Sequence, residues 1–257
     1  MIRVERAGHW FRAEQWLFRD LSFSVADGEA TAILGPNGCG KTTLLRALAA
    51  TLALQEGRIA IDGIVGVVPQ ALRADVAYRV IDMVLLGRSR YLGRFGAPGR
   101  RDLARAEACL AAVGLIDLAE RRYDRLSGGQ RQLVLFARAL ASDCRVLLLD
   151  EPASALDLAN QGVVLRLIRR LVREEGMTVL FTTHHPDHAL AVADKVLMMT
   201  GEPVFGPVAT TLDEANLARL YGVAVRRVTV EVEGRLVEAT VPVHRLDGDV
   251  TIGAPPS

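Results

Sequence analysis

The sequence predicts an α/β fold in which helices cover a parallel β-sheet, and two observations support this prediction. Compact apolar runs, typical of buried strands, recur at EATAIL, RVLLLD, MTVLFTT and KVLMMT. Helical patterns follow the second and third of these runs, at NQGVVLRLIRRLVREE and PDHALAVA. Because neighbouring parallel strands need a long connection, usually a helix, the alternation indicates a parallel sheet with helices on its faces.

Two further parts are expected around this sheet. MIRVERA and LSFSVADGE alternate apolar and polar residues, which predicts an N-terminal antiparallel β subdomain. After Gln70, helical patterns dominate at AYRVIDMVLLGR and RDLARAEACLAAVG, with a Gly-, Pro- and Arg-rich interruption between them. We therefore expect a helical subdomain at 71–126, inserted into a core made of residues 1–70 and 127–222.

The C-terminal segment, residues 223–257, is expected to form a hairpin and a tail. The runs VAVRRVTVEV and RLVEATVPV alternate on either side of Glu233-Gly234, which predicts two strands joined by a tight turn. Just upstream, Thr211 and Glu214 have the spacing of a capping box and predict a short helix.

Composition excludes several classes of protein. The 31 Lys and Arg residues nearly balance the 30 Asp and Glu residues, so no charge excess indicates a nucleic-acid partner. Cys39, Cys109 and Cys144 show no CxxC pairing, so we expect reduced thiols and neither a disulfide framework nor a zinc site. No apolar run approaches the roughly 18 residues of a spanning helix, and the N-terminus lacks a signal-like stretch, so a cytosolic chain is expected.

The segment GPNGCGKTT, between the strand EATAIL and the helix pattern KTTLLRALAA, predicts a phosphate-binding loop and hence a P-loop NTPase. Its glycines allow close approach of backbone N–H groups to phosphate, and the following helix N-terminus adds positive potential. Lys41 is expected to reach the β and γ phosphates, and the Thr42 hydroxyl to bind Mg²⁺. The expected ATP contacts are Asn37, Gly38, Cys39, Gly40, Lys41, Thr42 and Thr43.

The strand RVLLLD ends in an acidic pair, Asp150 and Glu151. At the carboxyl edge of a parallel sheet, Asp150 is expected to hold Mg²⁺ and Glu151 to polarise the water that attacks the γ phosphate. An acidic pair after a strand is also a common helix N-cap, but the phosphate-binding loop upstream favours the catalytic interpretation.

A second anion site is predicted at LSGGQ, where Ser127, Gly128, Gly129 and Gln130 precede a helix pattern. With this pentapeptide between the two phosphate-site segments, the chain resembles the ABC ATPase family from its N-terminus to about Tyr221. The resemblance implies a head-to-tail dimer in which each ATP lies between the phosphate-binding loop of one chain and LSGGQ of the other.

The resemblance also assigns the remaining site residues. Gln70 matches the family's Q-loop glutamine, which contacts Mg²⁺ and the attacking water, and residues 154–157 match its D-loop, which crosses the dimer interface. His184 matches the switch histidine at the γ phosphate, which leaves His185 and His188 as expected surface residues. A lone histidine after a strand is more often structural, but the strand here should end beside the site. The adenine-stacking aromatic falls on Phe11, with Trp10 as its competitor.

Among ABC ATPases, VIDMVLLGRSR, LLLDEPASALDLANQ and TVLFTTHHPDHAL resemble importer subunits for iron chelates, haem, cobalamin and molybdate, and the short connection from GRIAIDG to IVGVVPQ most resembles the molybdate and tungstate group. This implies a permease in the membrane, a substrate-binding protein acting indirectly, and a peripheral position at the cytoplasmic face of the inner membrane. Two other protein classes fit the sequence less well. Non-transport ABC proteins carry coiled-coil insertions or paired ATPase domains, and a P-loop kinase gives no reason for LSGGQ.

Two interpretations remain for the segment after Gln70. Val80, Met83, Val84 and Leu85 have helical spacing and should pack inside the helical subdomain. Leu72, Val76 and Tyr78 either complete that packing or, as the resemblance implies, line a groove that receives a helix of the permease.

Overall fold

The centre of the fold is a six-stranded sheet with the strand order β5-β6-β7-β3-β8-β9, seen in a computed structural model that describes residues 1–12, 15–70, 77–93 and 96–243. All neighbours pair in parallel except β9, which is antiparallel to β8. The bounds are β3 (Ala30–Leu34), β5 (Val65–Val68), β6 (Val146–Leu149), β7 (Thr178–Thr183), β8 (Lys195–Met198) and β9 (Val204–Pro207). The predicted buried strands are confirmed as β3, β6, β7 and β8.

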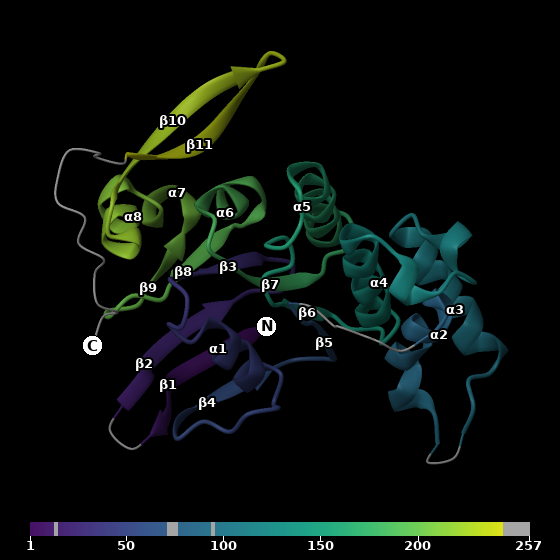
Figure 1. Cartoon of the computed structure of the whole chain (residues 1–257). Helices are drawn as coiled ribbons and strands as arrows, with labels where there is room; N and C mark the ends of the chain where they lie inside the picture. Colours follow the sequence, from purple (N-terminus) through teal and green to yellow (C-terminus); the bar gives the residue numbers. More distant parts are fainter. Residues whose placement is uncertain (13–14, 71–76, 94–95, 244–257) are drawn as a thin grey trace.

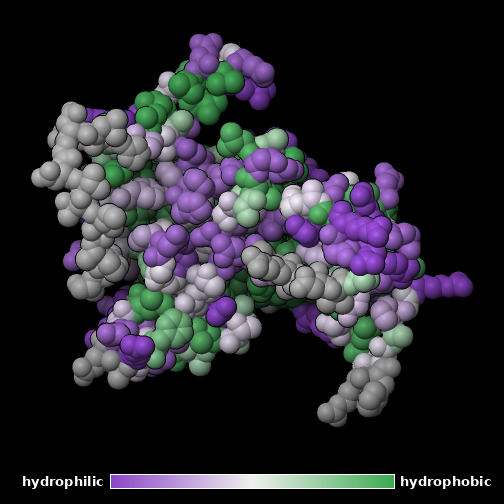
Figure 2. Space-filling view, viewed as in Figure 1, coloured by the Kyte–Doolittle hydropathy of each residue, from purple (hydrophilic) through white to green (hydrophobic). Residues whose placement is uncertain are grey.

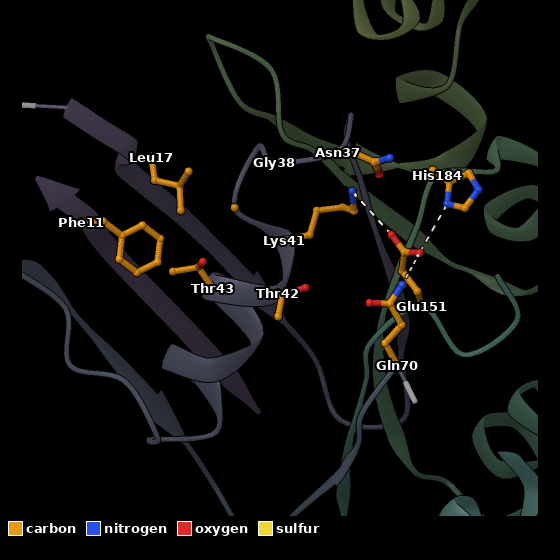
Figure 3. A pocket seen from close by; sticks show the side chains of 11 residues that line it. Phe11, Leu17, Asn37, Gly38, Lys41, Thr42, Thr43, Gln70, Glu151 and His184 are labelled. Atoms are coloured by element: carbon orange, nitrogen blue, oxygen red, sulfur yellow. Dashed lines mark hydrogen bonds and ion pairs between the residues drawn. The ribbon is translucent and has the colours of Figure 1, made fainter. Parts of the chain in front are cut away.

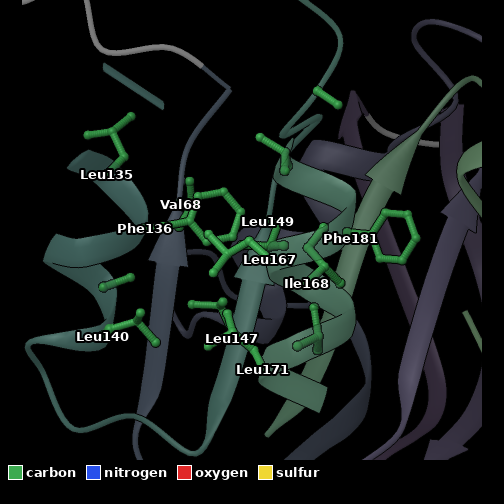
Figure 4. Packing of buried hydrophobic residues seen from close by; sticks show 14 of the residues in the cluster. Val68, Leu135, Phe136, Leu140, Leu147, Leu149, Leu167, Ile168, Leu171 and Phe181 are labelled. Carbon is green, nitrogen blue, oxygen red and sulfur yellow. The ribbon is translucent and has the colours of Figure 1, made fainter. Parts of the chain in front are cut away.

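Both faces of this sheet are buried, which explains why its strands are continuously apolar. Successive side chains of β6 alternate between two core clusters, with Leu147 and Leu149 in one and Val146 and Leu148 in the other. The first cluster packs against α4 (Gly128–Leu140) and α5 (Leu158–Arg173), as Figure 4 shows.

The second cluster lies under α1 (Lys41–Leu48) and joins it to an antiparallel sheet of order β2-β1-β4. These strands are β1 (Ile2–Arg12), β2 (Gln15–Val25) and β4 (Glu56–Ile61). In Figure 1 this sheet forms a separate layer below the parallel sheet. The predicted antiparallel pairing of the N-terminal strands is confirmed, and Leu17 and Phe18 of β2 lie beside Gly40 at the start of α1.

A helical region extends from the other end of the sheet (Figure 1). It contains α2 (Val80–Leu85), α3 (Arg100–Ala112) and the short 3₁₀ turns η1 (Leu86–Tyr91), η2 (Ile116–Leu118) and η3 (Tyr123–Arg125). α2 packs against both α3 and α4. The α-helix begins at Val80 because Arg79 is extended, with ψ 156°, and acts as its N-cap. The subdomain limits 71–126 stay a proposal.

The C-terminal part contains α6 (Pro186–Val192), α7 (Val208–Thr211), α8 (Glu214–Tyr221) and the hairpin β10 (Ala224–Val232) and β11 (Arg235–Val243). The hairpin is confirmed, and its turn residues Glu233 and Gly234 have φ of 51° and 74°. The predicted capping box is wrong, because Thr211 ends α7 and the carboxylate of Asp213 caps α8 by accepting from Asn216 N.

The hairpin presents an exposed apolar face. Val230 and Val237 lie opposite each other on it and are exposed, and apolar side chains gather on the hairpin in Figure 2. The opposite face rests on α6, where Asp187 Oδ1 accepts from Thr240 N at 2.7 Å and from Thr240 Oγ1 at 2.8 Å.

No helix of the described residues is long and apolar enough to cross a bilayer.

Candidate nucleotide site

A cavity of about 490 Å³ lies at the carboxyl edge of the parallel sheet, where ligands bind in open α/β sheets. The loops after four neighbouring strands, β5, β6, β7 and β3, reach this edge. Phe11 and Leu17 lie at one side of the cavity and Glu151 and His184 at the other, with Lys41 between them (Figure 3). Its lining is Phe11, Leu17, Asn37, Gly38, Gly40, Lys41, Thr42, Thr43, Gln70, Glu151 and His184.

The loop between β3 and α1 wraps around its own lysine. The Lys41 ammonium donates to Gly35 O at 2.8 Å and to Pro36 O at 3.0 Å. At Gly40, the N-cap of α1, φ is 102°, and a Cβ would lie 2.8 Å from Leu17 Cγ. Glycine is therefore required both for the left-handed backbone and for the close approach of β2. The loop and its buried lysine form a cradle that fits a polyphosphate.

Beside the cradle, Asp150 accepts two hydroxyl hydrogen bonds on one oxygen. Thr42 Oγ1 donates to Asp150 Oδ1 at 3.1 Å, and Thr182 Oγ1 donates to the same atom at 2.8 Å. Asp150 is buried and does not line the cavity. A hydroxyl and a carboxylate at this separation are oxygen ligands of the kind that Mg²⁺ prefers. The sequence did not point to Thr182, which is the penultimate residue of β7, the strand that pairs with β6.

The Glu151 carboxylate is surrounded by polar groups from three other segments. Its Oε2 accepts from Gln70 Nε2 at 3.2 Å and lies 3.6 Å from His184 Nδ1, and its Oε1 lies 3.8 Å from Lys41 Nζ. The backbone of Glu151 is in the left-handed region with φ of 45°, where its N–H donates to Thr182 Oγ1 at 2.7 Å. Such strain in a non-glycine residue is common at functional sites.

His184 faces the cavity with an unpaired nitrogen. Among the described residues, the buried Nδ1 has no hydrogen-bond partner. The backbone of His184 is held from behind, because Tyr221 Oη donates to His184 O at 2.9 Å. Burial raises the pKa of the Tyr221 hydroxyl, so it remains a donor. Sequence reasoning missed Tyr221, which lies where the family resemblance ends.

The aromatic residues of β1 differ in their surroundings. Phe11 is 69% exposed and lines the cavity, whereas Trp10 packs edge-on against Trp16 with ring centroids 4.3 Å apart. His9 supports the Phe11 ring edge-on at 5.0 Å. This arrangement favours Phe11 over Trp10 as the ring on which a base stacks.

The LSGGQ segment lies outside this cavity. Ser127 and Gln130 cap α4 reciprocally: Ser127 Oγ accepts from Gln130 N at 3.2 Å and Gln130 Oε1 accepts from Ser127 N at 3.1 Å. A Cβ on Gly129 would lie 2.6 Å from Asn160 Oδ1, so this glycine lets α4 approach the start of α5. Ser127 and Gly128 are exposed, and Cys39 also lies outside the cavity lining.

The expectation that His188 is a surface residue is wrong. Its side chain is buried, with Nδ1 3.1 Å from Thr183 Oγ1 and Nε2 3.4 Å from Gln161 Oε1. Burial, with a smaller contribution from His185, lowers the pKa of His188 to about 4. His185 is half-buried, so the whole HHPDH segment is less exposed than its polarity suggests.

Comparison with known proteins places this site in a family. The family model described as ABC transporter matches residues 18–154. The molybdate import ATP-binding protein MolC of Haemophilus influenzae is 43% identical over 221 residues, covering 86% of this chain and 87% of that protein. The hemin import ATP-binding protein HmuV of Burkholderia thailandensis is 38% identical over 260 residues, covering 89% of this chain and 95% of that protein.

Solved structures show the same similarity. A metal-chelate type ABC transporter in an inward-facing conformation is 39% identical with a TM-score of 0.91, covering 95% of this chain and 97% of that chain. A dimeric ATP-binding cassette in a post-hydrolysis state, bound to ADP and phosphate, is 25% identical with a TM-score of 0.70, covering 81% of this chain and 99% of that chain.

The lowered pKa of His188 predicts a dependence of stability on pH. Below pH 6.5 the unfolded chain takes up a proton at His188, whereas in the folded chain His188 stays neutral until the pH falls to about 4. As the pH falls through this window, His188 should remove up to about 3 kcal/mol of unfolding free energy. Urea titrations of the isolated subunit should therefore show a shallower loss of stability for His188→Gln than for the parent. Titrations at pH 8, where His188 is neutral in both the folded and the unfolded parent, correct for the effect of the substitution itself. Parallel pH profiles of the parent and His188→Gln would contradict the lowered pKa of His188.

Proposed function

The chain belongs to the ABC transporter family of ATP-binding proteins, and we propose that it is the ATP-hydrolysing subunit of an importer that takes up molybdate or tungstate. The observation that carries the ATPase assignment is the convergence of Lys41, Gln70 and His184 on the Glu151 carboxylate at the edge of a phosphate cradle. A separate membrane permease would carry the substrate.

The choice of substrate rests on similarity, because the transported ligand in such systems contacts other subunits. The molybdate import relative is more similar over the chain than the hemin import relative, at 43% against 38% identity. The short connection from β4, ending at Ile61, to β5, starting at Val65, is the feature by which the sequence resembles the molybdate group. Iron-siderophore, haem or cobalamin import is the alternative.

Each residue of the site has a role in the proposed reaction. Phe11 stacks on the adenine, the loop Asn37–Thr43 with Lys41 binds the phosphates, and His184 Nδ1 contacts the γ phosphate. Glu151 orients and polarises the attacking water, which Gln70 helps to hold. Thr42, Asp150 and Gln70 would hold Mg²⁺, which when bound neutralises charge on the phosphate oxygens.

A head-to-tail dimer completes the site in this proposal. Ser127 and Gly128 are exposed at the N-terminus of α4, outside the cavity of their own chain. A helix N-terminus with a serine and glycines is suited to bind phosphate, so it would serve the ATP of a second copy. Binding of two ATP molecules closes the dimer, and hydrolysis removes the contacts of Ser127 and His184 with the γ phosphate and opens it.

The remaining partners follow from the importer assignment. The chain would sit peripherally at the cytoplasmic face of the inner membrane, bound to polytopic permease subunits and acting indirectly with a substrate-binding protein. We propose no nucleic-acid partner.

The permease contact is proposed to lie just after Gln70. Val80, Met83 and Val84 are buried, as predicted, whereas Tyr78 is 47% exposed and does not complete the core. The backbone of Tyr78 is fixed, since Tyr78 O accepts from Tyr123 N at 2.9 Å. Leu72 and Val76 lie outside the described residues. An exposed aromatic on a fixed backbone, at the start of the helical region, suits a protein contact.

The import proposal is tested with the complex purified from host membranes and reconstituted into vesicles. The parent should accumulate labelled molybdate or tungstate when ATP is present. Glu151→Gln should keep ATP binding but lower turnover and uptake about 10²–10⁴-fold, because it removes a positioned base. Glu175→Gln, the same change at an exposed position, is the control and should behave as the parent. Accumulation of hemin in place of the oxyanions would favour the alternative, and normal turnover of Glu151→Gln would remove its assigned role.

The composite sites are tested in mixed dimers. When one chain carries Lys41→Ala and the other carries Ser127→Arg, both changes fall on one composite site, so one ATP should remain bound in the closed dimer. When both changes are on one chain, both sites should fail. Counting bound nucleotides in the two preparations measures this difference, and equal counts would rule out the head-to-tail arrangement.

The permease contact is tested with Tyr78→Asp. Because the side chain is exposed, the melting temperature and basal ATP hydrolysis of the isolated subunit should stay within about one or two degrees and about 2-fold of the parent. Assembly with the permease should be lost, as measured by co-purification, and Tyr78→Phe should restore it. A melting temperature lower by several degrees would instead show that Tyr78 is a core residue.

A further inference from the structure

A row of hydrogen-bonded polar side chains lies behind the cavity and takes no part in its lining. It runs from Thr183 at the end of β7, through His188 in α6, to Gln161 in α5. Thr183 is 4% and His188 8% exposed. Burying polar groups costs free energy unless they are paired, so apolar residues would fill this space more favourably if packing were their only role.

The hydrogen bonds of this row of side chains have one consistent direction. The N–H of His185 donates to Thr183 Oγ1 at 3.0 Å, so the Thr183 hydroxyl can donate to His188 Nδ1 at 3.1 Å. This leaves the proton of neutral His188 on Nε2, which faces Gln161 Oε1 at 3.4 Å. Gln161 Nε2 in turn donates to Leu156 O at 3.0 Å. The lowered pKa of His188 fits this order, because the neutral ring both accepts and donates.

At both ends, this row of side chains is hydrogen-bonded to the backbone of a loop that carries residues of the proposed reaction. Leu156 O belongs to the loop after Glu151, in which Ser154 Oγ donates to Glu151 O at 3.1 Å. At the other end, His185 follows His184, whose Nδ1 lies 3.6 Å from Glu151 Oε2. The side chains therefore close a ring of contacts that starts and ends at Glu151.

We propose that Thr183, His188 and Gln161 form a relay that fixes the position of the Glu151 loop relative to the His184 loop. These three are therefore positioning residues for ATP hydrolysis. The inference rests on the proposed function of Glu151 and His184. None of the three relay residues lines the cavity, so breaking the relay should slow hydrolysis without weakening ATP binding. Movement of the 154–157 loop, which in the proposed dimer faces the second copy, would then reach His184 through these side chains.

The test is a double-mutant cycle on the purified complex with its permease. Thr183→Val removes the hydroxyl at one end of the relay, and Gln161→Met removes the amide at the other end with little change of size. Each should lower kcat about 10-fold with KM for ATP within about 2-fold of the parent. Because either change alone breaks the relay, the double variant should be no slower than the single ones.

Three further variants sharpen the result. Thr183→Ser keeps the hydroxyl and should restore kcat, and Gln161→Glu, which still accepts from His188 but cannot donate to Leu156 O, should behave as Gln161→Met. If Thr183→Val does not fold, His188→Leu replaces it in the cycle. Multiplicative losses of about 100-fold in the double variant would mean independent effects and overturn the relay, as would unchanged kcat in either single variant. A parent complex without ATP hydrolysis would instead contradict the proposed function itself.

Discussion

The placement of the Glu151 carboxylate is the constraint on which the rest of the site depends. It lies two residues beyond the end of β6, on a backbone with φ of 45°, and Thr182 from the neighbouring strand accepts from its N–H while also donating to Asp150. One hydroxyl thus sets the relative position of both acidic residues. The strain at Glu151 is tolerated because β6 is buried in the sheet between β5 and β7, which leaves the strand end little freedom.

The same sheet explains why residues distant in sequence meet. Gln70, Glu151 and His184 follow β5, β6 and β7, which are neighbours in the sheet. Their side chains therefore converge at one edge of the sheet although the three residues are far apart in the sequence. Phe11 comes from the antiparallel sheet, which α1 joins to the core. The cavity is therefore a joint product of two sheets, and the buried side chains under α1 set the distance between Phe11 and the phosphate cradle.

Sequence reasoning succeeded where the signal was local. The buried strands and the phosphate loop were predicted because their patterns lie within a few consecutive residues. Thr182, Tyr221 and Gln161 were missed because each acquires its role through a partner more than ten residues away, at Asp150, His184 and His188. His188 was misassigned because HHPDH is polar in sequence, whereas its burial depends on how α6 packs against α5.

In the proposed transporter, the helical region would supply the physical route from the nucleotide to the permease. α2 packs against α3 and α4, and Val80, Val84 and Leu135 belong to one core cluster, so these helices resist independent displacement. Ser127 caps α4 at one end of this unit, and Tyr78 lies just before α2 at another. Gln70 contacts Glu151 directly and follows β5, which packs against α4, so a displacement of Gln70 at the phosphate would act beside the same unit. Rigid-body rotation of the helices would then move Ser127 and Tyr78 together, so that closure of the proposed dimer would be coupled to the proposed permease contact without any rearrangement inside the core.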